Sequence, residues 1–103
     1  MTPTQRTLKH LRDQGYTAAV CEKWNPHARI RQDLFGCLDI IAINGQTREI
    51  LGVQCTSGSG YSRRVQKLRE LPIVTQLSKA GMSVEVWGWR KLKTGWQVKR
   101  YYL

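Results

Sequence analysis

The stretch from Leu38 to Cys55 places the strongest limits on what this chain can fold into. Residues 38–43 (LDIIAI) form a compact apolar run, Asn44-Gly45 is a typical turn pair, and residues 49–55 (EILGVQC) form a second β-type run. Two such runs joined by a short, turn-rich connection predict a β-hairpin. The sequence therefore predicts two neighbouring strands in the middle of the chain.

The segments on both sides of this hairpin predict an α/β fold. A chain of 103 residues has no room for a second module, so residues 1–103 are expected to form one domain. Proline cannot continue a regular helix, so the helical pattern after the hairpin should break at Pro72. In chain order, we expect a helix over 4–14, a strand over 16–24, an exposed loop over 25–36, the hairpin, a Gly/Ser loop over 56–60, a broken helix over 61–80 and strands over 83–89 and 96–102. This order predicts a central mixed sheet flanked by helices, with a C-terminal β-hairpin.

The charge balance narrows the choice of partners. Lys and Arg number 17 against 7 Asp and Glu, which gives a formal net charge of +10, and a folded domain this basic is typical of nucleic-acid binders. Hydrophobic residues make up 41% of the chain, which excludes a disordered basic tail. No apolar run approaches the roughly 18 residues of a membrane span, and the polar start does not resemble a secretory signal, so we expect a cytoplasmic protein with no membrane partner. Three widely spaced cysteines lack the spacing of a zinc site and are expected to be buried, reduced thiols.

Asp39 is the residue that most needs an explanation, because it lies inside the apolar run 38–43. Burial of an unpaired carboxylate costs several kcal/mol, so Asp39 either faces solvent at a strand edge or has a function. Gln54 and Thr56 lie two residues apart on the next predicted strand and so share one face of it. We therefore expect Asp39, Gln54 and Thr56 to meet at one end of the hairpin.

A strand-borne Asp, a hairpin and a following helix resemble the PD-(D/E)XK nuclease superfamily, in particular its small branches of archaeal-type Holliday junction resolvases and VRR-NUC domains. The resemblance runs from about Arg31 to Leu77, and residues 31–36 are similar to the Gly-containing loop before the metal-binding Asp. It implies a restriction-endonuclease-like α-β-β-β-α-β core and an endonuclease that hydrolyses DNA, including branched or structured DNA, with Mg²⁺ or Mn²⁺. A two-fold homodimer is implied as well.

The resemblance also assigns candidate site residues. Asp39 corresponds to the metal-binding Asp, Gln54 falls at the usual Glu and Thr56 at the usual Lys. The metal would then be held by Asp39, Gln54 and the main-chain carbonyl of Cys55. An amide offers an oxygen but no charge, and a threonine supplies no cation. Asp33, if its loop folds back, or Glu22 would restore a second carboxylate, and a cation of the following helix would replace the lysine.

Two groups of cations are candidates for binding nucleic acid, with DNA favoured over RNA. Arg63, Arg64 and Lys67 follow a Gly-rich loop at a predicted helix start, where free backbone N–H groups favour anions; a solvated helix face is the alternative. Arg29 and Arg31 lie in the loop over 25–36. The closing hairpin interleaves aromatic and cationic residues, but most of its tryptophans are expected to serve the core.

Two further hypotheses stay open beside the nuclease. The Gln and Thr substitutions favour a nuclease-fold module that binds nucleic acid without cutting it. A structural or protein-interaction subunit, in which the positive charge serves solubility, is the third.

Overall fold

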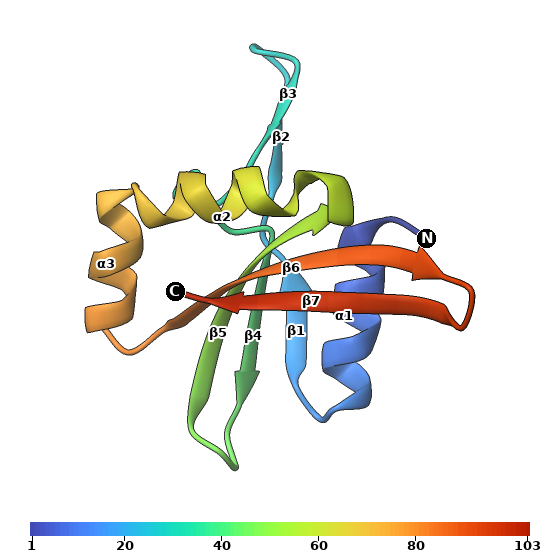
Figure 1. Ribbon diagram of the computed structural model, residues 1–103. Helices are drawn as coiled ribbons and strands as arrows, with labels where there is room; N and C mark the ends of the chain where they lie inside the picture. Colours follow the sequence, from blue (N-terminus) through green and yellow to red (C-terminus); the bar gives the residue numbers. More distant parts are fainter.

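The central hairpin of the sequence prediction is present and forms the middle of a five-stranded sheet. The computed structural model describes all 103 residues, with strands in the order β1-β4-β5-β6-β7 (Figure 1). These strands are β1 (Thr17–Val20), β4 (Ile40–Asn44), β5 (Glu49–Ser57), β6 (Ser83–Leu92) and β7 (Gly95–Tyr102). Only β5 and β6 pair in parallel, and the other neighbours are antiparallel. The expected α/β domain with a mixed central sheet and a C-terminal hairpin is therefore confirmed.

Helices cover both faces of the sheet, because alternate residues of the central strands are apolar on each side. Helix α1 (Pro3–Asp13) begins at a capping box formed by Thr2 and Gln5 and places Leu11 against the inner residues of β1, β4 and β5. Helices α2 (Tyr61–Arg69) and α3 (Pro72–Lys79) cover the other face and form the crossover between the parallel strands β5 and β6. The expected break at Pro72 is present, since Leu71 before it is extended. No helix is both long and apolar enough to span a membrane.

The tryptophans of the C-terminal hairpin divide between core and surface. Trp87 and Trp89 are buried next to α1, where the His10 ring lies edge-on to both, so the expected core role holds for these two. Trp96 is 45% exposed and Tyr102 is 66% exposed, so these two rings lie on the surface. His10 is partly buried against the tryptophans rather than a free surface residue of its helix.

An ion pair inside β6 and β7 leads to a stability prediction. Glu85 is 4% exposed, and its Oε1 accepts from Arg100 Nε at 2.9 Å and from Trp87 Nε1 at 3.0 Å. Arg100→Met keeps the side-chain bulk but leaves a buried carboxylate without a cation, so we expect the free energy of unfolding to fall by about 3 kcal/mol. Urea denaturation measures this, with the exposed Arg90→Met as a control that should change stability by less than about 0.5 kcal/mol. A loss below about 1 kcal/mol for Arg100→Met would contradict the assigned role.

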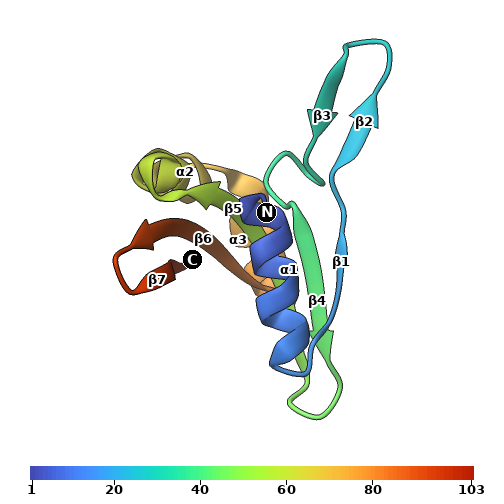
Figure 2. The same ribbon diagram turned by 90° about the vertical axis from the view of Figure 1, so that its right-hand side faces the viewer.

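Two expectations about the region before β4 are wrong. The strand expected over 16–24 is divided into β1 and a separate strand β2 (Lys23–Asn25), and the loop expected over 25–36 contains β3 (Ile30–Gln32). Strands β2 and β3 pair with each other and form a two-stranded ribbon, residues 23–32, that projects from the domain (Figure 2). Each strand has only three residues and no buried side chain, so neither shows the alternation of apolar and polar residues that identifies a strand from sequence.

The Gly/Ser loop is also shorter than expected. Strand β5 continues through Thr56 to Ser57, and residues Gly58–Gly60 form a short 3-10 turn, η1, before α2. Gly60 is needed there because a Cβ at this position would collide with Thr56 Oγ1. The extra length of β5 holds both Gln54 and Thr56 inside a regular strand, on the face toward α2.

Candidate functional site

Three carboxylates gather at the end of β4 where the chain enters it. The side chains of Glu22, Asp33 and Asp39 place one oxygen atom each within 4.8 Å of one another. They come from three segments: Glu22 follows β1, Asp33 follows β3 and Asp39 precedes β4. Of the two alternatives for Asp39, the solvent-facing strand edge is wrong, because Asp39 is only 5% exposed.

Backbone hydrogen bonds hold Asp39 between the neighbouring strands. The Asp39 N–H donates to the Val53 carbonyl at 2.8 Å, and the Asp39 carbonyl accepts from the Cys21 N–H at 2.8 Å. The second bond continues the pairing of β1 and β4 by one residue beyond Val20 and Ile40. It brings Glu22, the residue after Cys21, to the same end of the sheet as Asp39.

A tight turn returns Asp33 to the cluster. The Gly36 N–H donates to the Asp33 carbonyl at 2.9 Å, and the Leu34 N–H donates to the Leu38 carbonyl at 2.9 Å. The turn needs a positive φ at Phe35 (56°) and at Gly36 (74°). The loop therefore folds back in the way that would let Asp33 supply a second carboxylate, and Glu22, the other candidate, lies there too.

Gln54, a residue of β5, forms hydrogen bonds with two of the carboxylates. Its Nε2 donates to Asp39 Oδ2 at 2.7 Å and to Asp33 Oδ2 at 3.2 Å. Asp39 Oδ2 also accepts from the Cys55 N–H at 2.7 Å. The Gln54 side chain is 1% exposed, and its Oε1 is buried without any hydrogen-bond partner. A buried amide oxygen without a donor is unfavourable, so the arrangement lacks one interacting group.

The cluster carries more negative charge than the surrounding residues neutralise. Burial and, after it, the interaction with the nearby Asp33 raise the pKa of Asp39 from its ordinary 3.8 to about 7, although the hydrogen bonds from Cys55 and Gln54 act in the opposite direction. Neither Asp33 nor Asp39 forms an ion pair with a lysine or arginine, and Arg31 Nη1 lies 3.9 Å from Glu22 Oε1. The site therefore has an affinity for a proton or another cation.

The residues present fit a hard divalent cation. Carboxylate and amide oxygens are the ligands that Mg²⁺ and Mn²⁺ prefer, and Asp39, Asp33 and Glu22 supply three such groups. The Gln54 amide now points its nitrogen at the carboxylates, so its oxygen would face a cation only after a half rotation of the amide group. That rotation would also move the oxygen out of its unpartnered position.

The expected contribution of Cys55 is seen only in part. Its main-chain N–H contacts Asp39, whereas the metal ligand expected from the sequence was its carbonyl, which stays a prediction. The Cys55 side chain belongs to the buried cluster next to α1, and burial raises the pKa of its thiol to about 12, so no thiolate is available at neutral pH. All three cysteines are free, but Cys21 is only partly buried.

Among the other predicted site residues, only Arg31 forms an ion pair with a clustered carboxylate, that of Glu22. Thr56 is buried, with its Oγ1 against Gly60. Arg63, Arg64 and Lys67 lie on the first two turns of α2, and none forms an ion pair with the cluster, so the structure shows no replacement for the missing lysine. Arg29 and Arg31 are exposed on the projecting ribbon.

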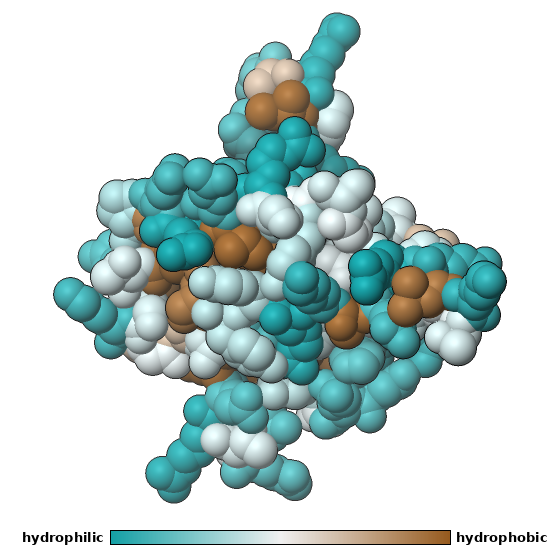
Figure 3. Space-filling view, viewed as in Figure 1, coloured by the Kyte–Doolittle hydropathy of each residue, from teal (hydrophilic) through white to brown (hydrophobic).

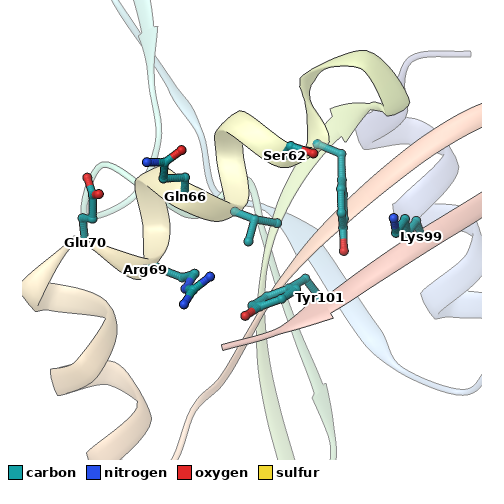
Figure 4. A pocket seen from close by; sticks show the side chains of 8 residues that line it. Ser62, Gln66, Arg69, Glu70, Lys99 and Tyr101 are labelled. Carbon is teal, nitrogen blue, oxygen red and sulfur yellow. The ribbon is translucent and has the colours of Figure 1, made fainter.

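A surface pocket of about 810 Å³ is distinct from the acidic cluster. It lies between α2 and β7, where the side chain of Arg69 is directed toward Tyr101 (Figure 4). None of the three clustered carboxylates lines it. The acidic cluster and this pocket are therefore separate sites on the domain.

Comparisons with known proteins identify no relative: no family model, no curated protein and no solved structure matches this chain. Its function is therefore argued from the geometry described above.

Proposed function

We propose that this protein is a metal-dependent endonuclease that hydrolyses phosphodiester bonds in DNA with Mg²⁺ or Mn²⁺. The observation that carries the proposal is the cluster of Glu22, Asp33 and Asp39, three carboxylates of which only Glu22 forms an ion pair with a lysine or arginine. Such a cluster on a domain of net charge +10 is a place where a divalent ion and a polyanion would meet.

The arrangement of the sheet supports the proposed restriction-endonuclease-like core. Strands β1, β4, β5 and β6 are neighbours in that order, and the only parallel pair is joined by the helical crossover of α2 and α3. With α1 in front and the ribbon strands β2 and β3 set aside, the order of elements is compatible with the α-β-β-β-α-β core that the resemblance implies. In such a core Asp39 and Gln54 would be metal ligands, as the resemblance implies.

Each residue of the cluster would have a role in binding the metal or the phosphate. Asp39, Asp33 and Glu22 would hold the ion, and Gln54 would join them through its oxygen. A bound Mg²⁺ or Mn²⁺ activates water and neutralises charge on the phosphate. Because Thr56 is buried against Gly60 and carries no charge, cationic help at the phosphate would come from Arg31, which lies beside Glu22.

One observation favours the second function, a module that binds nucleic acid without cutting it. The Gln54 amide already donates to both Asp33 and Asp39, and this partly replaces the neutralisation that a metal would provide. In that case DNA binding would be sensitive to salt, independent of divalent ions and unaffected by Asp39→Ala.

A cleavage assay separates the two functions. Duplex, single-stranded and junction DNA are incubated with Mg²⁺, Mn²⁺ or a chelator, and light scattering of the same preparation tests the implied dimer. Metal-dependent cleavage that disappears in Asp39→Ala supports the nuclease. Cleavage that persists unchanged in Asp39→Ala refutes the assignment, and tight binding with no cleavage in any metal favours the binding module.

The cations at the start of α2 give a separate prediction. Arg63 and Arg64 lie in the first turn of α2, on the side of the domain where β5 ends. We expect Arg63→Ala/Arg64→Ala to weaken DNA binding and to reduce the slope of log K against log salt by about 0.9 for each lost phosphate contact. Fluorescence anisotropy across a salt series measures this. An unchanged slope would place both arginines on a merely solvated helix face.

A further inference from the structure

The ribbon of residues 23–32 has no role in the core, yet it carries two large apolar side chains that are exposed. Trp24 is 53% exposed and Ile30 is 51% exposed. They lie on opposite faces of the ribbon, because Trp24 is paired with Arg31 and Ile30 with Asn25. In Figure 3 apolar atoms appear among hydrophilic ones on this projection. The ribbon therefore presents one large apolar side chain on each of its faces.

The charge of the ribbon indicates which class of partner it fits. Residues 23–32 contain three cations, Lys23, Arg29 and Arg31, all exposed, and no acidic residue. A second copy of this chain would bring the same cations against its own in a two-fold contact, which is unfavourable. A polyanion is complementary to this surface.

The dimensions of the ribbon favour duplex DNA over duplex RNA as the polyanion. Three-residue strands at about 3.3 Å per residue reach about 10 Å, and the major groove of B-form DNA is about 12 Å wide and about 8.5 Å deep, enough for a two-stranded β-ribbon. The major groove of A-form RNA is too narrow for side chains to read. The ribbon therefore fits duplex DNA and does not fit duplex RNA.

The position of the ribbon connects it to the acidic cluster. Glu22 immediately precedes β2 and Asp33 immediately follows β3, so both ends of the ribbon are residues of the cluster. Figure 2 shows the ribbon extending from the same end of the sheet at which β4 begins. A duplex held by the ribbon would have its backbone next to the carboxylates.

We propose that the β2–β3 ribbon binds in the major groove of B-form duplex DNA, with Lys23 and Arg29 on phosphates and Trp24 against the groove wall. The proposal specifies the substrate class of the proposed nuclease, but the binding itself does not require cleavage. The proposal assigns DNA binding to the ribbon and metal binding to the neighbouring carboxylates.

The test measures binding in chelator, so that it is independent of metal chemistry. Fluorescence anisotropy compares labelled duplex DNA and duplex RNA of the same sequence, about 20 base pairs long, a length that exposes more than one turn of groove. Lys23→Ala/Arg29→Ala is compared with Arg48→Ala/Lys79→Ala, which removes two exposed cations elsewhere: Arg48 lies in the β4–β5 turn, at the opposite end of the sheet (Figure 1), and Lys79 at the end of α3. Trp24→Ala tests the apolar contact, and circular dichroism with thermal melting verifies that each variant folds.

We expect duplex DNA to bind at least about tenfold more tightly than duplex RNA, and the ribbon double variant to lose at least about fivefold in affinity while the control loses less than about twofold. Trp24→Ala should lose affinity without changing the salt slope. Equal losses in the two double variants, equal binding of RNA, or a dimer that Trp24→Ala dissociates would overturn the proposal.

The outcomes for the ribbon and for the nuclease are distinguishable. Ribbon-dependent binding without cleavage in Mn²⁺ would reject the proposed nuclease and keep the ribbon's role. Cleavage that depends on Asp39 but is indifferent to the ribbon variants would reject the ribbon's role and keep the nuclease.

Discussion

Asp39→Asn should abolish metal-dependent cleavage while making the metal-free protein more stable. Asp39 Oδ2 accepts from Gln54 Nε2 and from the Cys55 N–H, and an asparagine oxygen in the same place accepts both bonds. The amide nitrogen would lie toward Asp33, where it donates in place of a proton. The substitution thus removes a buried like-charge contact without leaving a polar atom unpaired, but it also removes the charge that a metal needs.

The expected gain in stability follows from the raised pKa of Asp39. Folding raises this pKa from 3.8 to about 7, so between these values the folded protein binds a proton that the unfolded chain does not. The contribution of Asp39 to stability in chelator is therefore greatest below about pH 4, falls as the pH rises through about 7 and is constant above that. Since one pKa unit corresponds to about 1.4 kcal/mol, the loss has an upper bound of about 4 kcal/mol.

Urea denaturation in chelator at several pH values tests this. Asp39→Asn should remove most of the downward slope, whereas Asp13→Asn, which changes an exposed carboxylate of α1, should leave the slope in place. In Mn²⁺ the order should reverse, because only the wild type gains stability from the ion. If Asp39→Asn is less stable than the wild type in chelator above about pH 7, the carboxylates do not repel one another in the folded protein.

Gln54→Glu should have the second-largest effect: it should destabilise the metal-free protein and strengthen metal binding. The substitution places a further carboxylate where Gln54 Nε2 now lies 2.7 Å from Asp39 and 3.2 Å from Asp33. In chelator at neutral pH we expect a loss of about 2–4 kcal/mol, because two hydrogen bonds become contacts between like charges. With Mn²⁺ the new carboxylate becomes a ligand, so metal affinity should rise by at least about tenfold and cleavage should increase.

Thermal melting over a Mn²⁺ titration measures both effects on one protein. The exposed Gln66→Glu on α2 is the matched control, since it adds the same charge away from the cluster and should respond to Mn²⁺ like the wild type. If Mn²⁺ fails to restore the melting temperature of Gln54→Glu, the cluster is not a metal site. The non-cutting nucleic-acid module then becomes the better proposal.

The candidate site could be anticipated from sequence only where its residues are close in the chain. Asp39 and Gln54 belong to one hairpin, and the two-residue period of a strand places Gln54 on a definite face, so their meeting follows from local rules. Asp33 was foreseen only on the condition that its loop folds back. That condition depends on positive φ at Phe35 and Gly36, and the sequence marks only the glycine. The ribbon was missed because its strands bury nothing and so leave no pattern in the sequence.

The sequence by itself therefore determined the central hairpin, the break at Pro72, the excess of positive charge and the pairing of Asp39 with Gln54. Each of these depends on neighbouring residues or on composition. The tertiary structure decided that Glu22 and Asp33 join Asp39, that no lysine reaches them and that a cationic ribbon leads away from the cluster. These features depend on how separate segments are held by the sheet. The burial and the nearby Asp33 that raise the pKa of Asp39 act only once folding has brought those segments together and excluded water.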